Sequence, residues 1–329
     1  MTRPLWINDT EVQSLLDPAV AYDAVHTALT NHAMGKYIQP LKPYIRPRGR
    51  EEEAVGGRYI AMPAYLDAPF SSVGIKWIAS VPTNIERGIP RASGVIVLNS
   101  IETGEVTAIM ECSFLSAYRT AAVAAIAFDY FAIDEPRTVA LLGAGPIGEQ
   151  TMSLLLAKPR DINKLLIFDI KQHRAQQLAE SIKQKFGISV EVCESSEIAV
   201  RNANVVVCAT VGSSGYLKYD WLTEGVLIIC LSLEDPTEET FLQCKVVIDD
   251  WQQCNREEKL IHRLTKQGRF SQDKVYAELG EVIFGKKNRR TSKDERFLVS
   301  PMGMAIEDLS VASIVLTRAK ERGIGTVLN

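Results

Sequence analysis

The chain has 329 residues, a formal net charge of −3 and 46% hydrophobic residues, a composition typical of a soluble globular protein. This length is too great for one compact core and predicts two domains. The charge balance indicates no nucleic-acid or membrane partner, and no apolar run approaches the ~18 residues of a membrane span. With no apolar signal core at the N-terminus and no C-x-x-C pair among the six cysteines, we expect a cytoplasmic protein with reduced thiols.

The first 115 residues predict a sheet-rich α+β domain. Asp17 followed by Pro18 is typical of a helix start, and Gly35 is expected to end that helix after Met34. Short apolar runs then predict four strands: Tyr59–Met62, Val73–Ile78, Gly94–Leu98 and Val106–Met110. The last two are joined by Asn-Ser-Ile-Glu-Thr-Gly, which predicts a hairpin turn. The charged segment 46–53 is expected to be a solvated loop.

A second domain is predicted over residues 116–304. An alanine-rich helix, Phe114–Phe131, would carry the chain into it. Six apolar runs separated by helical segments predict its strands: Val139–Leu142, Leu165–Phe168, Ser189–Val192, Val205–Cys208, Val226–Cys230 and Val246–Ile248. This alternation is typical of an α/β fold with a Rossmann-type, doubly wound parallel sheet.

The end of the chain is expected to return to the first domain. The basic segment Lys286–Arg296 is predicted to be a surface loop, and Phe297–Val299 could form one more strand. Ala305–Glu321 has the spacing of an amphipathic helix, and residues 305–329 are assigned to the first domain.

A glycine-rich turn follows the first strand of the second domain. Gly143, Gly145 and Gly148 form G-x-G-x-x-G, in which one glycine makes a tight turn, one lets the backbone approach a pyrophosphate and one lets helix pack on strand. Pro146 and Ile147 open the helix, whose N-terminal N–H groups would face the phosphates. Taken alone, the glycine pattern also fits an ordinary strand–helix turn.

An acidic residue at the end of the next strand favours dinucleotide binding. Asp169 lies about 20 residues beyond the glycines, where a carboxylate accepts hydrogen bonds from the adenosine ribose and repels a 2′-phosphate. We therefore expect NAD rather than NADP, with Lys171, His173 and Arg174 as nearby cations that would favour NADP.

Three charged residues interrupt apolar segments and are candidates for chemistry. Lys76 lies inside the apolar strand SVGIKWIASV, where it either meets an anion or points into solvent. Arg119 interrupts the first turns of the alanine-rich helix and is either a carboxylate-binding fork or a helix-surface arginine. Asp235 follows a strand of the parallel sheet, where ligands bind but where ordinary N-cap aspartates also occur.

Other chemistries have no support in the sequence. The four histidines do not cluster and no H-E-x-x-H or Cys/His set is present, so we expect no metal site. No G-x-S-x-G element is present to indicate a serine hydrolase. A nicotinamide enzyme of this sequence would need acid–base groups from Lys, Asp, Glu or Tyr.

Several phrases occurring in order resemble the ornithine cyclodeaminase/mu-crystallin family. They are GIKW, NIERGIP…ASGVIVL, LSAYRTAA, GAGPIG, AELGEVIFG and PMGMAIEDLSVA, and they cover nearly the whole chain. Within the family, QPLKPYIR, IPRASGVIVLN, VVIDDWQQCNRE and PMGMAIEDLS are most similar to the branch that forms 2,3-diaminopropionate for siderophores and antibiotics. The resemblance implies a homodimer built through the first domain.

The resemblance also implies roles for individual residues. Lys76 matches the family's active-site lysine, Arg119 its substrate-carboxylate arginine, and Asp235 the aspartate proposed to activate water. The family commonly has arginine where QPLK has Lys42, and Arg46 could replace it.

Further contacts complete the expected site. Arg91 joins Lys42, Arg46 and Arg119 as a substrate-binding cation, because the resemblance implies an amino-acid-type substrate that carries several carboxylates. Thr120, Thr210 and Met302 are expected to contact the cofactor together with the glycine turn and Asp169. The segment after Asp235, PTEETF, departs from the family's usual Pro-Gly-Lys.

The function that the resemblance implies is NAD-dependent oxidative hydrolysis of a secondary amine, N-(2-amino-2-carboxyethyl)-L-glutamate, to 2,3-diaminopropionate and 2-oxoglutarate. The alternatives are an ornithine cyclodeaminase, a ketimine reductase or an alanine-type dehydrogenase on the same fold. A ligand-binding protein without turnover is a further possibility from a different class.

Overall fold

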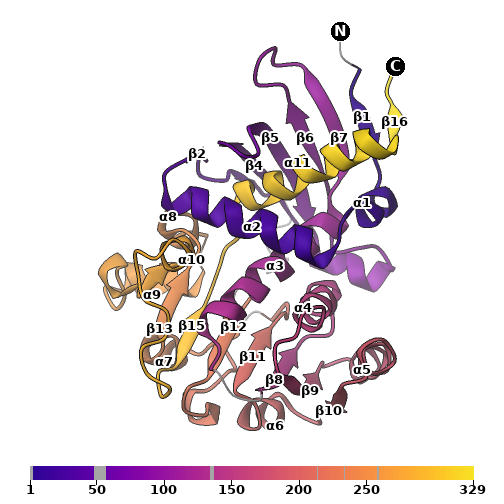
Figure 1. Ribbon diagram of the computed structural model, residues 1–329. Helices are drawn as coiled ribbons and strands as arrows, with labels where there is room; N and C mark the ends of the chain where they lie inside the picture. Colours follow the sequence, from indigo (N-terminus) through magenta and orange to yellow (C-terminus); the bar gives the residue numbers. More distant parts are fainter. Residues whose placement is uncertain (1–2, 48–56, 134–136, 213, 233, 258) are drawn as a thin grey trace. The chain divides into compact units, whose positions relative to one another are not determined.

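The structure is a computed structural model that describes residues 3–47, 57–133, 137–212, 214–232, 234–257 and 259–329 (Figure 1). The chain divides into two compact units. Unit 1 comprises Met1–Arg119 and Gly303–Asn329, and unit 2 comprises Thr120–Met302. The division falls close to the expected boundaries after residues 115 and 304, and the substrate-binding role of unit 1 stays a prediction. Most of the charged segment 46–53 lies outside the described residues.

Unit 1 contains a mixed eight-stranded sheet in the order β16-β1-β7-β6-β5-β4-β2, with β3 also paired to β4. Its elements are β1 (Leu5–Ile7), α1 (Asp9–Leu15), α2 (Pro18–Ala33), β2 (Tyr37–Ile38), β3 (Tyr44–Ile45), β4 (Arg58–Leu66), β5 (Ser72–Ser80), η1 (Pro82–Arg87), β6 (Ala92–Asn99), β7 (Val106–Glu111), α11 (Ala305–Arg322) and β16 (Thr326–Val327). Strand β1 pairs parallel with β7, and the other recorded pairs are antiparallel. The sequence patterns missed the short elements β1, β16 and α1.

Helix α11 covers one face of this sheet and lies beside α2 (Figure 1). In β5 the buried residues alternate with more exposed ones, so Lys76 and Ile78 face the helix while Ile75 and Trp77 face away. The second face is apolar and only half-buried. Its side chains include Tyr59, Pro63, Ile75, Trp77, Val95, Val97 and Ile109.

Unit 2 contains an eight-stranded sheet in which every recorded strand pair is parallel. The strands are β8 (Arg137–Leu142), β9 (Ile162–Phe168), β10 (Ser189–Val192), β11 (Val205–Cys208), β12 (Leu227–Cys230), β13 (Lys245–Ile248), β14 (Ala277–Glu278) and β15 (Phe297–Val299). Their spatial order is β10-β9-β8-β11-β12-β15-β13-β14. The six predicted strands and the doubly wound class are confirmed, and β15 enters between β12 and β13.

The helices of unit 2 connect these strands. They are α3 (Ser113–Phe131, which begins in unit 1), α4 (Pro146–Leu156), α5 (Gln172–Phe186), α6 (Ser196–Arg201), α7 (Glu238–Gln243), α8 (Trp251–Cys254), α9 (Leu260–Lys266) and α10 (Leu279–Ile283), with short 3-10 turns η2 (Tyr219–Trp221) and η3 (Gln272–Lys274). The strands are buried on both sides, which explains their continuous apolar runs.

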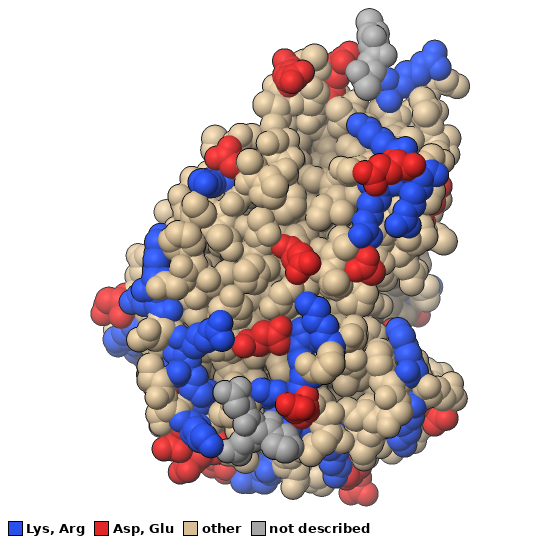
Figure 2. Space-filling view, in the orientation of Figure 1, with Lys and Arg blue, Asp and Glu red and all other residues tan. Residues whose placement is uncertain are grey.

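The surface charges, the cysteines and the helix lengths can be compared with what the composition predicts. On the face drawn in Figure 2, basic and acidic side chains are interspersed. All six cysteines are described and buried, and no disulfide joins them. Among the described helices none is long and apolar enough to cross a membrane.

Candidate functional site

The glycine turn of unit 2 has the geometry that a dinucleotide requires. Gly143 has a φ of +100°, and a Cβ on it would lie 2.6 Å from the Ala209 carbonyl oxygen. A Cβ on Gly148 would lie 2.3 Å from the Gly143 oxygen, so α4 packs closely on the turn. Gly145 is the N-cap of α4, and a Cβ there would meet nothing within 4 Å. The open space at Gly145 fits a pyrophosphate over the helix N-terminus.

Asp169 faces this turn from the end of β9. One carboxylate oxygen accepts a hydrogen bond from the Ala144 N–H and the other from the Lys171 N–H, each at 2.7 Å. A carboxylate oxygen accepts more than one hydrogen bond, so these contacts orient Asp169 without using its full capacity. Its position suits the ribose role expected for it.

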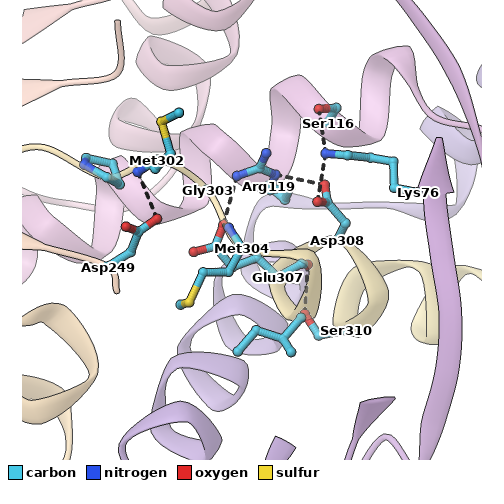
Figure 3. A network of polar contacts seen from close by, with 12 residues as sticks. Lys76, Ser116, Arg119, Asp249, Met302, Gly303, Met304, Glu307, Asp308 and Ser310 are labelled. Carbon is cyan, nitrogen blue, oxygen red and sulfur yellow. Dashed lines mark hydrogen bonds and ion pairs between the residues drawn. The ribbon is translucent and has the colours of Figure 1, made fainter. Parts of the chain in front are cut away.

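Lys76 is buried in unit 1 and paired with an acid on α11 (Figure 3). Its side chain is 1% exposed, and its Nζ lies 2.7 Å from Asp308 Oδ2 and 3.3 Å from Ser116 Oγ. Burial lowers the pKa of Lys76; Asp308 acts in the opposite direction, and Arg119 lowers this pKa further. The buried alternative for this lysine is therefore correct, and solvent exposure is excluded.

Arg119 binds the same acid pair. Its Nε donates to Asp308 Oδ1 and its Nη1 to Glu307 Oε2, both at 2.8 Å (Figure 3). The guanidinium group is therefore buried in a network, and the helix-surface interpretation is wrong. Glu307 and Asp308 are fully buried in the first turn of α11. Neither acid was assigned a role from the sequence. A Glu-Asp pair in the first turn of an otherwise apolar helix could have indicated two buried acids.

Lys42 contacts the residues that precede α11. It is 2% exposed, and its Nζ donates to the Gly303 carbonyl oxygen at 2.7 Å. Gly303 has a φ of +80°, and a Cβ on it would lie 2.6 Å from Arg119 Nη1. Lys42, Lys76 and Arg119 are thus brought together around the N-terminus of α11.

The remaining predicted cations form a separate group within unit 1. The Arg46 guanidinium lies 5.5 Å from the Tyr44 ring centroid, and Arg91 Nη1 donates to Ser80 Oγ at 3.1 Å.

Asp235 lies in unit 2 beyond the carboxyl end of β12. Its Oδ1 accepts a hydrogen bond from Thr210 Oγ1 at 2.5 Å, and Cys230 Sγ lies 3.8 Å from Oδ2. The carboxyl group is 1% exposed, and burial raises its pKa, while hydrogen bonds from Thr210, Tyr216 and Cys230 act to lower it. Asp235 is therefore a buried, hydrogen-bonded carboxyl group with a raised pKa, and its expected role in activating water stays a prediction. Tyr216 was missed because nothing in the sequence near it marks a functional residue.

Met302 is held by buried charges within unit 2. Its N–H donates to Asp249 Oδ2 at 2.9 Å, and Lys259 Nζ donates to the carbonyl oxygens of Ser300 and Pro301. Thr120 lies half-buried on α3. The expected cofactor contacts of Met302 and Thr120 stay predictions. Among the described residues no His, Cys, Asp or Glu cluster could hold a metal ion.

The parallel sheet, the glycine turn and the acid at the end of β9 define a protein of the dinucleotide-binding α/β class. Comparison with known sequences extends this conclusion. The ornithine cyclodeaminase/mu-crystallin family matches residues 5–323, and the chain belongs to this family.

Individual relatives include enzymes with different substrates. The N-((2S)-2-amino-2-carboxyethyl)-L-glutamate dehydrogenase of Staphylococcus aureus is 39% identical over 313 residues, which cover 94% of this chain and 93% of that protein. The Thermococcus litoralis Δ1-pyrroline-2-carboxylate reductase, solved with NADH and L-proline, has a TM-score of 0.92 at 27% identity, over 98% of this chain and 100% of that one. An archaeal alanine dehydrogenase, solved as a dimer with bound NAD, has a TM-score of 0.90 at 28% identity, over 100% and 99% of the two chains.

These similarities confirm the predicted family. The relatives are dehydrogenases and reductases, and two solved relatives carry NAD or NADH. The expectations of an NAD-dependent oxidoreductase and of NAD as cofactor are thereby confirmed at the level of the family.

The two glycines Gly145 and Gly148 should respond differently to an added methyl group. Gly145→Ala should fold normally but weaken NADH binding by about 1–3 kcal/mol, because the methyl group enters space suited to the pyrophosphate. Gly148→Ala should instead lower the melting temperature, because its Cβ would overlap the Gly143 oxygen. Fluorescence titration with NADH and thermal unfolding measure the two effects. Unchanged NADH affinity in Gly145→Ala would contradict the assignment.

Proposed function

We propose that this protein is an NAD-dependent dehydrogenase that oxidatively hydrolyses N-(2-amino-2-carboxyethyl)-L-glutamate to L-2,3-diaminopropionate and 2-oxoglutarate. The observation that carries the proposal is the 39% identity, over 94% of the chain, to the Staphylococcus aureus enzyme named for this substrate. The other relatives named above share less than 30% identity with this chain.

The charges of unit 1 support a substrate with several carboxylates. Lys42, Lys76 and Arg119 supply three buried cations around the start of α11, beside the two buried carboxylates of Glu307 and Asp308. The substrate carries three carboxylates, whereas ornithine, alanine and proline carry one each. Charge-assisted hydrogen bonds to carboxylates contribute about 1.5–3 kcal/mol each, so charge can discriminate between these substrates.

The chemistry is divided between the cofactor and the residues of the chain. When bound, NAD supplies the hydride acceptor for the glutamyl α-carbon. Arg119 and Lys76 would hold the carboxylate on that carbon and so orient its C–H bond. Asp235 would accept a proton from the water that adds to the resulting imine, and the carbinolamine then releases the amine and the 2-oxo acid. The hydrogen bond from Thr210 would keep the carboxylate of Asp235 directed to one position.

We also propose that the protein works in the cytoplasm and supplies 2,3-diaminopropionate for siderophore or antibiotic assembly. This setting is consistent with its buried thiols, which no disulfide joins. The 39% identity to the Staphylococcus aureus dehydrogenase supports the pathway assignment.

The open face of the unit 1 sheet supports a homodimer. This face is formed by half-buried apolar side chains, including Ile75 and Val97, which pair directly across β5 and β6. Trp77 on the same face is 38% exposed. We propose that a second copy of the chain covers it, because the archaeal alanine dehydrogenase of the same fold is described as a dimer. An apolar sheet face of this extent is otherwise an aggregation hazard.

The central experiment is an assay of NADH formation by the purified protein. With NAD and N-(2-amino-2-carboxyethyl)-L-glutamate we expect NADH and 2-oxoglutarate in equal amounts, and no NADH with ornithine or alanine. Lys76→Met should lower turnover at least about a hundredfold, because an orienting cation is lost. Lys164→Met, at a lysine on the surface of β9, is the matched control and should be fully active. Proline and ammonia from ornithine without net NADH would instead identify a cyclodeaminase.

The pH dependence of this turnover should report Asp235. If Asp235 is the base, activity is present above its raised pKa and is lost as the pH falls through that value. Thr210→Val removes a hydrogen bond that lowers this pKa, so the acid limb of the pH–rate profile should move to higher pH. Thr210→Ser keeps the hydroxyl donor and should leave the limb in place. An acid limb that is the same in all three proteins would exclude Asp235 as its origin.

The dimer is tested by placing a charge on the open sheet face. Ile75→Glu should convert a dimer into a monomer, because burying an unpaired carboxylate at an apolar interface costs several kcal/mol. Ile101→Glu, in the exposed β6–β7 turn, is the matched control and should remain dimeric. Light scattering after size-exclusion chromatography gives the masses. A monomeric parent protein, or a dimeric Ile75→Glu variant, would contradict the proposal.

A further inference from the structure

Two arginines face each other across neighbouring strands of unit 1. In the β3–β4 pair Tyr44 lies opposite Ile60 and Ile45 opposite Tyr59. Continuing this register by one residue brings Arg46 opposite Arg58. Both guanidinium groups lie over the Tyr44 ring, at 5.5 Å and 5.7 Å from its centroid. Arg58 was not singled out by the sequence patterns.

A third arginine joins them from the residue that precedes β6. Arg58 lies opposite Ser80 in the β4–β5 register, and Ser80 Oγ accepts a hydrogen bond from Arg91 Nη1 at 3.1 Å. Burial lowers the pKa of Arg91, and the charge of Arg58 lowers it further, so the two cations are close enough to repel. Arg46, Arg58 and Arg91 form what we call the arginine cluster.

Like charges close together on a sheet repel, and an anion between them relieves the repulsion. In the part of the chain that the structure describes, neither Arg58 nor Arg91 has an ion pair with a carboxylate, so the repulsion between these two cations is not compensated there. Cation–π contact with Tyr44 offsets only part of the repulsion. The arrangement therefore favours an anionic ligand with which planar guanidinium groups form paired hydrogen bonds.

The arginine cluster lies on the same face of the sheet as Lys76. Successive residues of a strand point to opposite faces, so Lys76, Ile78 and Ser80 share one face. Arg58 belongs to this face because it pairs directly with Ser80. Lys76 and Ser80 are four residues apart, about 13 Å along the strand. Long arginine side chains reach back over part of this distance, so one extended ligand can contact both groups.

We propose that Arg46, Arg58 and Arg91 form a subsite for the carboxylate at the end of the substrate's glutamyl side chain, with Arg58 as a specificity-determining residue. This subsite rests on the proposed function. The glutamyl side chain ends in a carboxylate alone, whereas the diaminopropionate end carries an ammonium group beside its carboxylate. Three arginines attract the first and repel the second, which fixes the direction in which the substrate lies between Lys76 and the cluster.

The test compares two ligands that differ only at this end. The product 2-oxoglutarate keeps the distal carboxylate, and 2-oxopentanoate has a methyl group in its place. By calorimetry with NADH present, the parent protein should bind 2-oxoglutarate about 10- to 100-fold more tightly. Arg58→Gln should lose most of this preference and bind 2-oxopentanoate as the parent does. Arg87→Gln, at an exposed arginine of η1, is the matched control and should keep the full preference.

A second variant separates an effect on binding from a loss of folding. Arg58→Lys retains the charge but not the planar fork, so it should keep part of the preference, and melting curves should show all variants folded. If Arg58→Gln is unfolded, Arg91→Gln with the same two ligands decides the question. Equal affinity of the parent for both ligands, or a full preference in the folded Arg58→Gln variant, would overturn the subsite.

The same proteins separate this subsite from the proposed function. No NADH from N-(2-amino-2-carboxyethyl)-L-glutamate, together with an Arg58-dependent preference for 2-oxoglutarate, would reject the substrate and support the subsite. NADH formation with an unchanged preference in Arg58→Gln would support the substrate and reject the subsite.

Discussion

The buried ion pairs at the start of α11 are the constraint on which unit 1 depends. Lys76 and Arg119 are both removed from water, and each is compensated by Asp308, with Glu307 as a second partner for Arg119. Removing one member of such a network leaves a buried charge unpaired, at a cost of about 3–5 kcal/mol. Arg119 and Asp308 are 189 residues apart in the chain, so the C-terminal helix must return to unit 1 before the two cations are stable there. The same network holds the cations in fixed orientations, as the proposed binding of a substrate carboxylate would require.

Unit 2 depends on a different constraint, the parallel register of its central strands. Cys208 pairs with Leu142 on one side and with Cys230 on the other, so β8, β11 and β12 end at one edge of the sheet. The glycine turn, Thr210 and Asp235 follow these three strand ends. Residues that are far apart in the sequence therefore lie along one edge, where open α/β sheets bind their ligands.

Much of this organisation was predictable because it follows from local patterns. The strands of unit 2 are continuous apolar runs, since both of their faces are buried, and Gly148 is required by its close contact with the Gly143 oxygen in the same turn. Asp17 and Pro18 start α2 as expected, with Asp17 accepting a hydrogen bond from the Val20 N–H. Strands of only two residues, such as β14 and β16, have too few residues for any period to appear, and they were missed.

The sequence by itself determined the two-part organisation, the dinucleotide turn and three charged candidates, Lys76, Arg119 and Asp235. Each of these features depends on a pattern of residues that are close together in the sequence. Only the tertiary structure decided what those charges do. A strand pattern cannot tell which of its two faces α11 covers, so the burial of Lys76 and its pairing with Asp308 were undetermined. In the same way, Arg46 and Arg58 are separated in sequence by a long segment, and only the register of β3 on β4 brings their like charges together.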